Sequence, residues 1–172
     1  MNKTLLSIGH GYSAQALARR LLPQGWRIIG TTRSADKARE IAASGVEPLI
    51  WPEVDLEPLL GQIPNVLISI GPGAYGDPLL NAYEATIARV AQGLRWVGYL
   101  STTGVYGNHD GGWVDENTAL TPTTKRGTAR MQAERRWQAI PALPLHIFRL
   151  AGIYGPGRGP FTKVKDGTAR RI

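Results

Sequence analysis

Two glycines and an alanine near the amino end of the chain have the spacing of a phosphate-binding turn. Gly9, Gly11 and Ala14 form a G-x-G-x-x-A sequence between an apolar run and a helical pattern of apolar residues. In that context the first glycine makes a tight turn, the second lets the backbone approach a pyrophosphate, and the alanine lets the helix pack closely on the strand. The amides of Tyr12 and Ser13, at the positive end of the helix, would face the phosphates. The alternative is an ordinary strand-to-helix turn that needs glycines.

A cationic segment follows about 20 residues later, where a dinucleotide site contacts the adenosine ribose. This segment contains Thr32, Arg33 and Ser34 and no acid. An Asp or Glu would accept a hydrogen bond from the 2′-hydroxyl of NAD, whereas a guanidinium beside two hydroxyls suits the 2′-phosphate of NADP. The segment therefore favours NADP over NAD, and the missing acid also argues against S-adenosylmethionine. The alternative for Arg33 is a surface loop arginine.

These residues need a sheet to position them, and strand and helix patterns alternate along the chain. Strands are predicted at residues 5–8, 26–30, 46–51, 65–70, 96–101 and 145–150, and helices at 14–22, 35–43, 78–92 and 124–138. This alternation predicts one α/β domain over residues 1–172, a doubly wound parallel sheet in a three-layer αβα Rossmann fold with strand order 3-2-1-4-5-6. Gly71 and Pro72 end the fourth strand at the carboxyl edge, on the adenosine side of the expected cofactor.

Composition narrows the possible functions. The chain has no cysteine, which excludes disulfides and thiolate chemistry. Its three histidines, His10, His109 and His146, lie far apart, so no metal site is expected, and we expect His10 to face solvent within the turn. The net charge of +7 raises a nucleic-acid-binding module as a weaker alternative, but the basic residues are scattered. With no apolar stretch of membrane-spanning length and no secretory signal, we expect a cytoplasmic protein with no nucleic-acid or membrane partner.

Four stretches together resemble a known superfamily. They are residues 9–14, residues 30–34, the S-T-T-G-V-Y-G run at 101–107 and the R-L-A-G-I-Y-G-P-G-R run at 149–158. The chain resembles, over essentially its whole length, an atypical or extended short-chain dehydrogenase/reductase of the NAD(P)-dependent epimerase/dehydratase-like branch. That resemblance implies an NADP-dependent oxidoreductase or epimerase/dehydratase-like protein that takes a small-molecule substrate, such as a sugar nucleotide or carbonyl compound, and pairs as a homodimer.

The resemblance also implies a Ser/Thr, Tyr, Lys catalytic arrangement. Thr102 falls at the hydroxyl position, whereas Arg126 and Arg130 stand where the tyrosine and lysine of the superfamily would be. A guanidinium stays protonated and cannot relay a proton. Two hypotheses follow, that Arg130 holds the cofactor's ribose or phosphate and that Tyr106 is a substitute acid; the alternative for Tyr106 is a packing role.

Two further expectations come from these departures. A non-catalytic NADP-binding sensor or interaction protein is the second candidate function, because the usual Tyr and Lys are replaced. Members of the superfamily continue past the sixth strand into a C-terminal substrate-binding region. We therefore expect these 172 residues to be the dinucleotide-binding part, truncated at the C-terminus.

Overall fold

Six strands form one sheet in the order β3-β2-β1-β4-β5-β6 in the computed structural model, which describes residues 2–168. The strands are β1 (Thr4–Ile8), β2 (Arg27–Thr32), β3 (Glu47–Ile50), β4 (Asn65–Ile68), β5 (Trp96–Thr102) and β6 (Leu145–Leu150). Every neighbouring pair is parallel. The strand order, the parallel direction and the fold class predicted from the alternation of patterns are confirmed.

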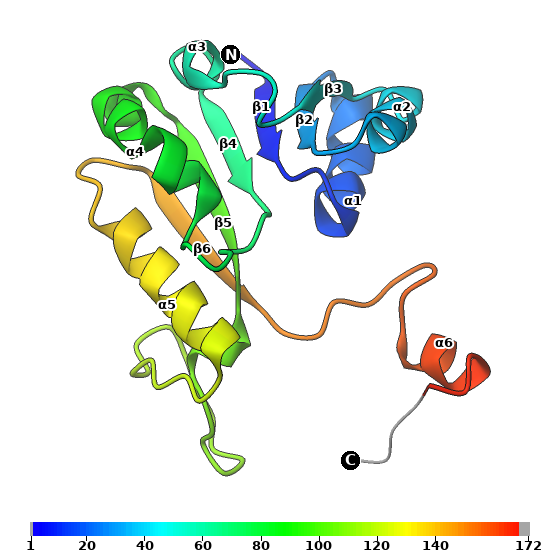
Figure 1. Cartoon of the computed structure of the whole chain (residues 1–172), viewed down its shortest axis with the longest axis vertical. Helices are drawn as coiled ribbons and strands as arrows, with labels where there is room; N and C mark the ends of the chain where they lie inside the picture. Colours follow the sequence, from blue (N-terminus) through cyan, green and yellow to red (C-terminus); the bar gives the residue numbers. More distant parts are fainter. Residues whose placement is uncertain (1, 169–172) are drawn as a thin grey trace.

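Helices cover both faces of the sheet. They are α1 (Tyr12–Leu21), α2 (Ala35–Ala43), α3 (Glu57–Leu60), α4 (Pro78–Val90), α5 (Lys125–Gln138) and α6 (Pro160–Lys165). Figure 1 shows α1 and α2 on one face and α4 and α5 on the other, with α6 at the end of the long segment after β6. The four-residue helix α3 was not predicted, since one turn is too short to show periodicity. Within residues 2–168 no helix is long and apolar enough to cross a bilayer.

Strand β1 shows why the strand sequences read as continuous apolar runs. All five of its residues are buried, because helices cover both faces of a parallel sheet. Leu6 and Ile8 belong to the larger core, under α4 and α5, whereas Leu5 belongs to the smaller core, under α1 and α2. The alternation of side chains along a strand divides one apolar run between two cores.

Asp77 fixes the start of α4 at the carboxyl edge of the sheet. One carboxylate oxygen accepts from the backbone N–H groups of Leu79 at 3.0 Å and Leu80 at 3.1 Å, which caps the helix. The other oxygen accepts from Nε1 of Trp137 on α5 at 3.0 Å. Because Asp77 is fully buried, this single side chain holds both helices in register above the same face of the sheet.

Candidate functional site

The turn after β1 depends on glycine at its first position. Gly9 has a φ of +76°, and a Cβ there would lie 2.3 Å from Cγ2 of Ile70. Its N–H donates to Oγ1 of Thr31 on β2 at 2.8 Å, and its carbonyl accepts from the hydroxyl of Ser69 after β4. The turn is thus held between the two strands that flank β1, and only a glycine fits the conformation and the space.

Helix α1 begins at this turn with its first amides uncapped. Gly11 is the N-cap residue and supplies no side-chain hydrogen bond, and only the carbonyl of Gly9 lies within 4 Å of a Cβ built there. Tyr12 and Ser13 line a cavity of about 260 Å³ at the mouth of the helix. Ala14, by contrast, is buried against the sheet. Open space beside free N–H groups at a helix start is the arrangement that binds a phosphate, so these residues fit the pyrophosphate of a dinucleotide.

A larger cavity, of about 820 Å³, extends from the glycine turn across the ends of β2 and β4 to the start of α4. Five of the predicted cofactor-binding residues line it: Gly9, Gly11, Thr32, Arg33 and Gly71. Pro72 does not line it, although Gly71 beside it does. A cavity at the carboxyl edge of a doubly wound sheet, where strand order reverses between β1 and β4, is where ligands bind in this architecture.

The end of β2 presents two cations to this cavity. Arg33 is exposed and lines it, as does Lys37 in the first turn of α2, which the sequence analysis missed. Lys37 follows Arg33 by four residues, so its spacing could have indicated a second cation at the same helix start. Ser34 does not line the cavity, because its hydroxyl caps α2 by accepting from the N–H of Lys37 at 3.3 Å. Thr32 accepts from the N–H of Ser34 at 3.4 Å.

His10 is buried, and the expectation that it faces solvent is wrong. Its side chain is 3% exposed and lies over Gly30 of β2, where a Cβ would come within 2.8 Å of the imidazole. The missing side chain of Gly30 leaves the room that the ring fills. Nδ1 lies 3.1 Å from the hydroxyl of Ser7, whereas Nε2 is buried with no hydrogen-bond partner. Burial, and secondly the charge of Lys37, lowers the pKa of His10 below its ordinary value.

Arg130 bridges the carboxyl ends of two strands beside the glycine turn. Its Nη1 donates to the carbonyl of Leu100 at 2.9 Å, to the hydroxyl of Tyr99 at 3.1 Å and to the carbonyl of Ile70 at 3.3 Å. Its Nη2 lies against Gly71, where a Cβ would come within 2.8 Å. Burial raises the pKa of Tyr99 to about 12, so its hydroxyl is neutral and accepts this bond. The guanidinium is therefore held at the edge of the smaller cavity, which it lines.

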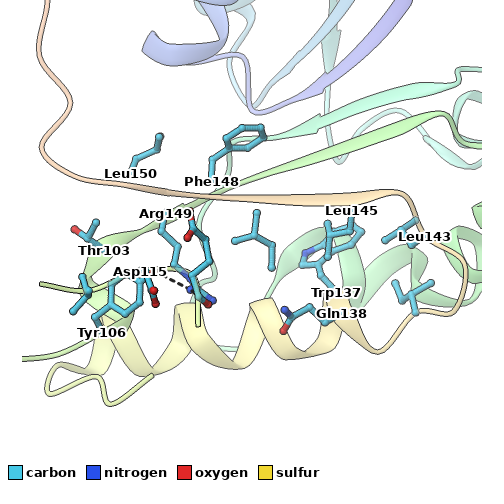
Figure 2. Close-up of a pocket in the computed structure, with 14 residues that line it drawn as sticks. Thr103, Tyr106, Asp115, Trp137, Gln138, Leu143, Leu145, Phe148, Arg149 and Leu150 are labelled. Atoms are coloured by element: carbon cyan, nitrogen blue, oxygen red, sulfur yellow. Dashed lines mark hydrogen bonds between the residues drawn. The ribbon is translucent and has the colours of Figure 1, made fainter. Parts of the chain in front are cut away.

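Thr102 and Tyr106 lie in different cavities. Thr102 lines the smaller one with Ser13 and Arg130. Tyr106 lines a separate cavity of about 690 Å³ between β6 and α5, where Figure 2 shows it near Arg149. It is 7% exposed, and its hydroxyl accepts from Nη1 of Arg149 at 3.0 Å. The structure thus brings Thr102 together with the glycine turn but does not bring Tyr106 to it, and the packing alternative describes where Tyr106 lies.

Arg126 is also separate from this group. It lies exposed in the first turn of α5 and lines neither of the two cavities at the glycine turn. Of the two arginines that stand at the tyrosine and lysine positions of the superfamily, only Arg130 reaches the site.

A buried ion pair supports the segment that carries Thr102. Glu134 of α5 is fully buried, and its carboxylate binds the guanidinium of Arg149 on β6, with 2.9 Å between Nη2 and Oε2. The other carboxylate oxygen accepts from the hydroxyl of Ser101 on β5. Since Ser101 directly precedes Thr102, this network fixes the end of β5 against both α5 and β6.

These features define the class of the protein. It is a three-layer α/β fold of the Rossmann type, with a glycine turn, an uncapped helix start and two cations around cavities at the carboxyl edge of the sheet. Among residues 2–168 no cluster of His, Asp or Glu side chains could hold a metal ion.

Comparison with known proteins agrees with this class. No family model matches the chain. Protein YeeZ of Escherichia coli strain K12 is 28% identical over 171 residues, which cover 92% of this chain and 61% of YeeZ. A functionally unknown conserved protein from Silicibacter pomeroyi DSS has a solved structure with a TM-score of 0.91 and 60% identity, covering 98% of this chain and 59% of that one.

Two other solved structures are similar to the chain. A protein from Methylobacillus flagellatus assigned as an NAD-dependent epimerase/dehydratase has a TM-score of 0.70 at 28% identity, covering 96% of this chain and 59% of its own. The Bordetella bronchiseptica enzyme WbmG, solved in complex with NAD and UDP, has a TM-score of 0.70 at 21% identity, covering 96% and 60%. The Methylobacillus flagellatus protein, at 28% identity, agrees with the epimerase/dehydratase resemblance. WbmG and a short-chain dehydrogenase/reductase superfamily protein from Agrobacterium tumefaciens, at 21% and 19% identity, share the fold. The chain spans about 60% of the length of these relatives.

Proposed function

We propose that residues 1–172 form one nicotinamide dinucleotide-binding domain that prefers NADP(H) to NAD(H), in an oxidoreductase or epimerase/dehydratase-like protein of the short-chain dehydrogenase/reductase superfamily. One observation carries the proposal. A single cavity of about 820 Å³ joins the glycine turn to two cations, Arg33 and Lys37, on the far side of β2. A cavity that reaches both places suits a molecule with one phosphate group at the turn and a second, separate phosphate at the end of β2.

The chain's own groups fit each part of the cofactor. The amides of Tyr12 and Ser13 would hold the pyrophosphate, since the N–H of Gly11 already donates to the carbonyl of Gly9 at 2.7 Å. Arg33 and Lys37 would neutralise the 2′-phosphate, with the Thr32 hydroxyl beside them. The chemistry that a bound nicotinamide supplies is hydride transfer.

The substrate side of the site rests on two other residues. Arg130 lines the smaller cavity together with Thr102 and would hold a ribose hydroxyl or a phosphate there. The Thr102 hydroxyl would donate to a carbonyl or hydroxyl of a small-molecule substrate such as a sugar nucleotide. Homodimer formation and a cytoplasmic location remain predictions.

The preference for NADP rests on local residues rather than on the neighbours. WbmG is 21% identical to this chain and was solved with NAD, a similarity that bears on the fold and not on the ribose pocket. In this chain the end of β2 holds Thr31, Thr32 and Arg33, with no acid to accept from a 2′-hydroxyl. Arg33 follows this strand end directly and Lys37, which pairs with Glu40, lines the same cavity, so two cations with no acid at the strand end favour a phosphorylated ribose.

A non-catalytic NADP-binding sensor is a second candidate function, and Arg130 favours it. This arginine stands at the lysine position of the superfamily's catalytic arrangement, and its Nη1 is already shared by Leu100, Tyr99 and Ile70. A guanidinium used in this way positions a ligand but relays no proton. Cofactor-dependent turnover of any carbonyl compound or sugar nucleotide would separate the enzyme from the sensor.

The test is a calorimetric titration of NADPH and NADH into the wild type and into Arg33→Ala and Lys37→Ala. We expect each substitution to weaken NADPH binding by roughly tenfold or more, as for a charge-assisted hydrogen bond worth about 1.5 to 3 kcal/mol, and to leave NADH binding nearly unchanged. Arg126→Ala is the matched control, since this exposed arginine lines neither cavity. Equal wild-type affinity for both cofactors would refute the NADP preference. If neither cofactor binds, the dinucleotide site itself is refuted.

A further inference from the structure

His10 has a polar atom that the folded chain leaves without a partner at the edge of the larger cavity. His10 lines that cavity, yet the residue is only 3% exposed. Nδ1 is used by Ser7 of β1, whereas Nε2 has no hydrogen-bond partner. A buried polar atom without a partner costs free energy of about 1 to 3 kcal/mol, so such atoms often mark a place where a ligand or a proton is expected.

The local sequence makes room for this imidazole. Gly30 of β2 lies under the ring, and even an alanine there would bring a Cβ to within 2.8 Å of it. The backbone N–H of His10 donates to the carbonyl of Thr31 at 2.8 Å, which fixes where the side chain starts. The imidazole is therefore held between the glycine turn and the end of β2, on the side of the cavity where Arg33 and Lys37 lie.

The charges around the ring are positive. Lys37 of α2 acts on it directly, and Arg33 lines the same cavity from the loop before α2. Of the acids on α2, Asp36 pairs with Arg39, whereas Glu40 pairs with Lys37 itself. Among residues 2–168, Arg33 is therefore the cation of this cavity that has no ion pair.

From β1 and β2 the ring is faced by groups that carry no charge. Ser7 contacts Nδ1, and Gly30 and Thr31 lie at the ring and at its backbone. Burial and the Lys37 charge thus both oppose a proton on His10, as its lowered pKa reflects.

We infer that His10 is a specificity-determining residue that takes up a proton when the chain binds a dinucleotide carrying a 2′-phosphate, and that its charged form stabilises that phosphate. This inference rests on the proposed NADP(H) site. A phosphate monoester brings a charge of about −1.5 to −2 to the cavity of Arg33 and Lys37. Because Glu40 already compensates Lys37, the phosphate outweighs the one remaining cation, Arg33, and the local charge becomes negative, which makes a protonated imidazole favourable. Whichever neutral tautomer precedes it, the protonated ring carries an N–H at Nε2, and the acceptor this atom lacks in the structure would then be supplied by the phosphate side of the cavity.

Proton uptake is measured by calorimetry on the intact 172-residue chain, in two buffers of different ionisation enthalpy near pH 7. We expect wild type to take up a fraction of a proton with NADPH and none with NADH. Where uptake approaches one proton, NADPH affinity rises by up to about tenfold per unit of falling pH. The cofactor's own phosphate, with a pKa near 6, releases protons on binding, which is the opposite sign and is common to all variants.

His10→Asn, which keeps a polar side chain but cannot titrate, should abolish the uptake and lower NADPH affinity while leaving NADH affinity unchanged. His146→Asn is the matched control, since this exposed histidine stacks on Trp96 at the other end of the sheet and should change nothing. If His10→Asn does not fold, NMR titration of wild-type His10 with and without NADPH tests the same point, because NADPH should raise its pKa.

Uptake that persists in His10→Asn, uptake that is equal with NADH, or a His10 pKa that NADPH leaves unchanged would overturn the inference, with the NADP(H) site intact. If neither dinucleotide binds, the proposed function and this inference both fail.

Discussion

Removing Arg149 should expose how strongly the buried ion pair stabilises the domain. In Arg149→Met the Glu134 carboxylate, which is fully buried, keeps only its bond from Ser101. The wild-type arginine side chain is itself only 15% exposed, and its guanidinium donates three hydrogen bonds to that carboxylate. An uncompensated buried charge of this kind typically costs about 3 to 5 kcal/mol. For a domain of this size that corresponds to a fall in Tm of roughly 6 to 20 °C.

The assay is urea and thermal unfolding followed by circular dichroism near pH 7. The matched control is Arg27→Met, which removes a pair whose arginine and glutamate side chains are 60% and 52% exposed. Water and salt screen such exposed pairs, so this one should contribute little to stability. The double variant Glu134→Gln with Arg149→Met should recover part of the loss, because no charge then remains buried. If Arg149→Met costs no more than Arg27→Met, the pair contributes like a surface pair and the reasoning is refuted.

Three other perturbations test separate parts of the site. Gly9→Ala should abolish dinucleotide binding and destabilise the fold, because φ is +76° and the new Cβ meets Ile70; wild-type affinity in a titration would contradict this. Tyr106→Phe should leave NADPH affinity and any turnover unchanged and cost about 1 kcal/mol in urea unfolding, since it removes the hydroxyl that accepts from Arg149; lost turnover would reinstate the tyrosine as an acid. Because the pKa of His10 is lowered in the folded state, the folded chain binds fewer protons at this residue than the unfolded chain below about pH 6.5. The free energy of unfolding, measured with urea, should therefore fall as the pH falls through that range, and it should fall less steeply in His10→Asn.

Much of the fold follows from short-range pattern and general rules of topology. The alternation of strand and helix patterns, with right-handed crossovers between parallel strands, leaves few possible strand orders. The observed order agrees with the one expected. The glycine turn is likewise local, because its conformation depends on Gly9 itself and on its place between a strand and a helix. Arg33 could be placed at the cavity because the end of the second strand always meets the carboxyl edge.

Other features depend on residues far apart in the chain. His10 is buried only because Gly30 lies beneath it, and Arg130 reaches the glycine turn only because β4 and β5 end side by side. Neither relation has a signal in the local sequence. Lys37 could be predicted in part. The start of the helix that carries it was predicted, but that its side chain lines the cavity was not.

The separation of Thr102 from Tyr106 shows most clearly which features the local sequence determines and which depend on the tertiary structure. The two residues lie in one short sequence motif, residues 101–107. The sequence by itself determines this motif, the strand and turn that carry it, and the order of the elements along the chain. Successive side chains of a strand point to opposite faces, so Ser101 meets Glu134 on α5, whereas Thr102 lies with Ser13 of α1. Which groups then share a cavity is decided by the packing of helices on the two faces, since that packing joins residues with no fixed spacing along the chain.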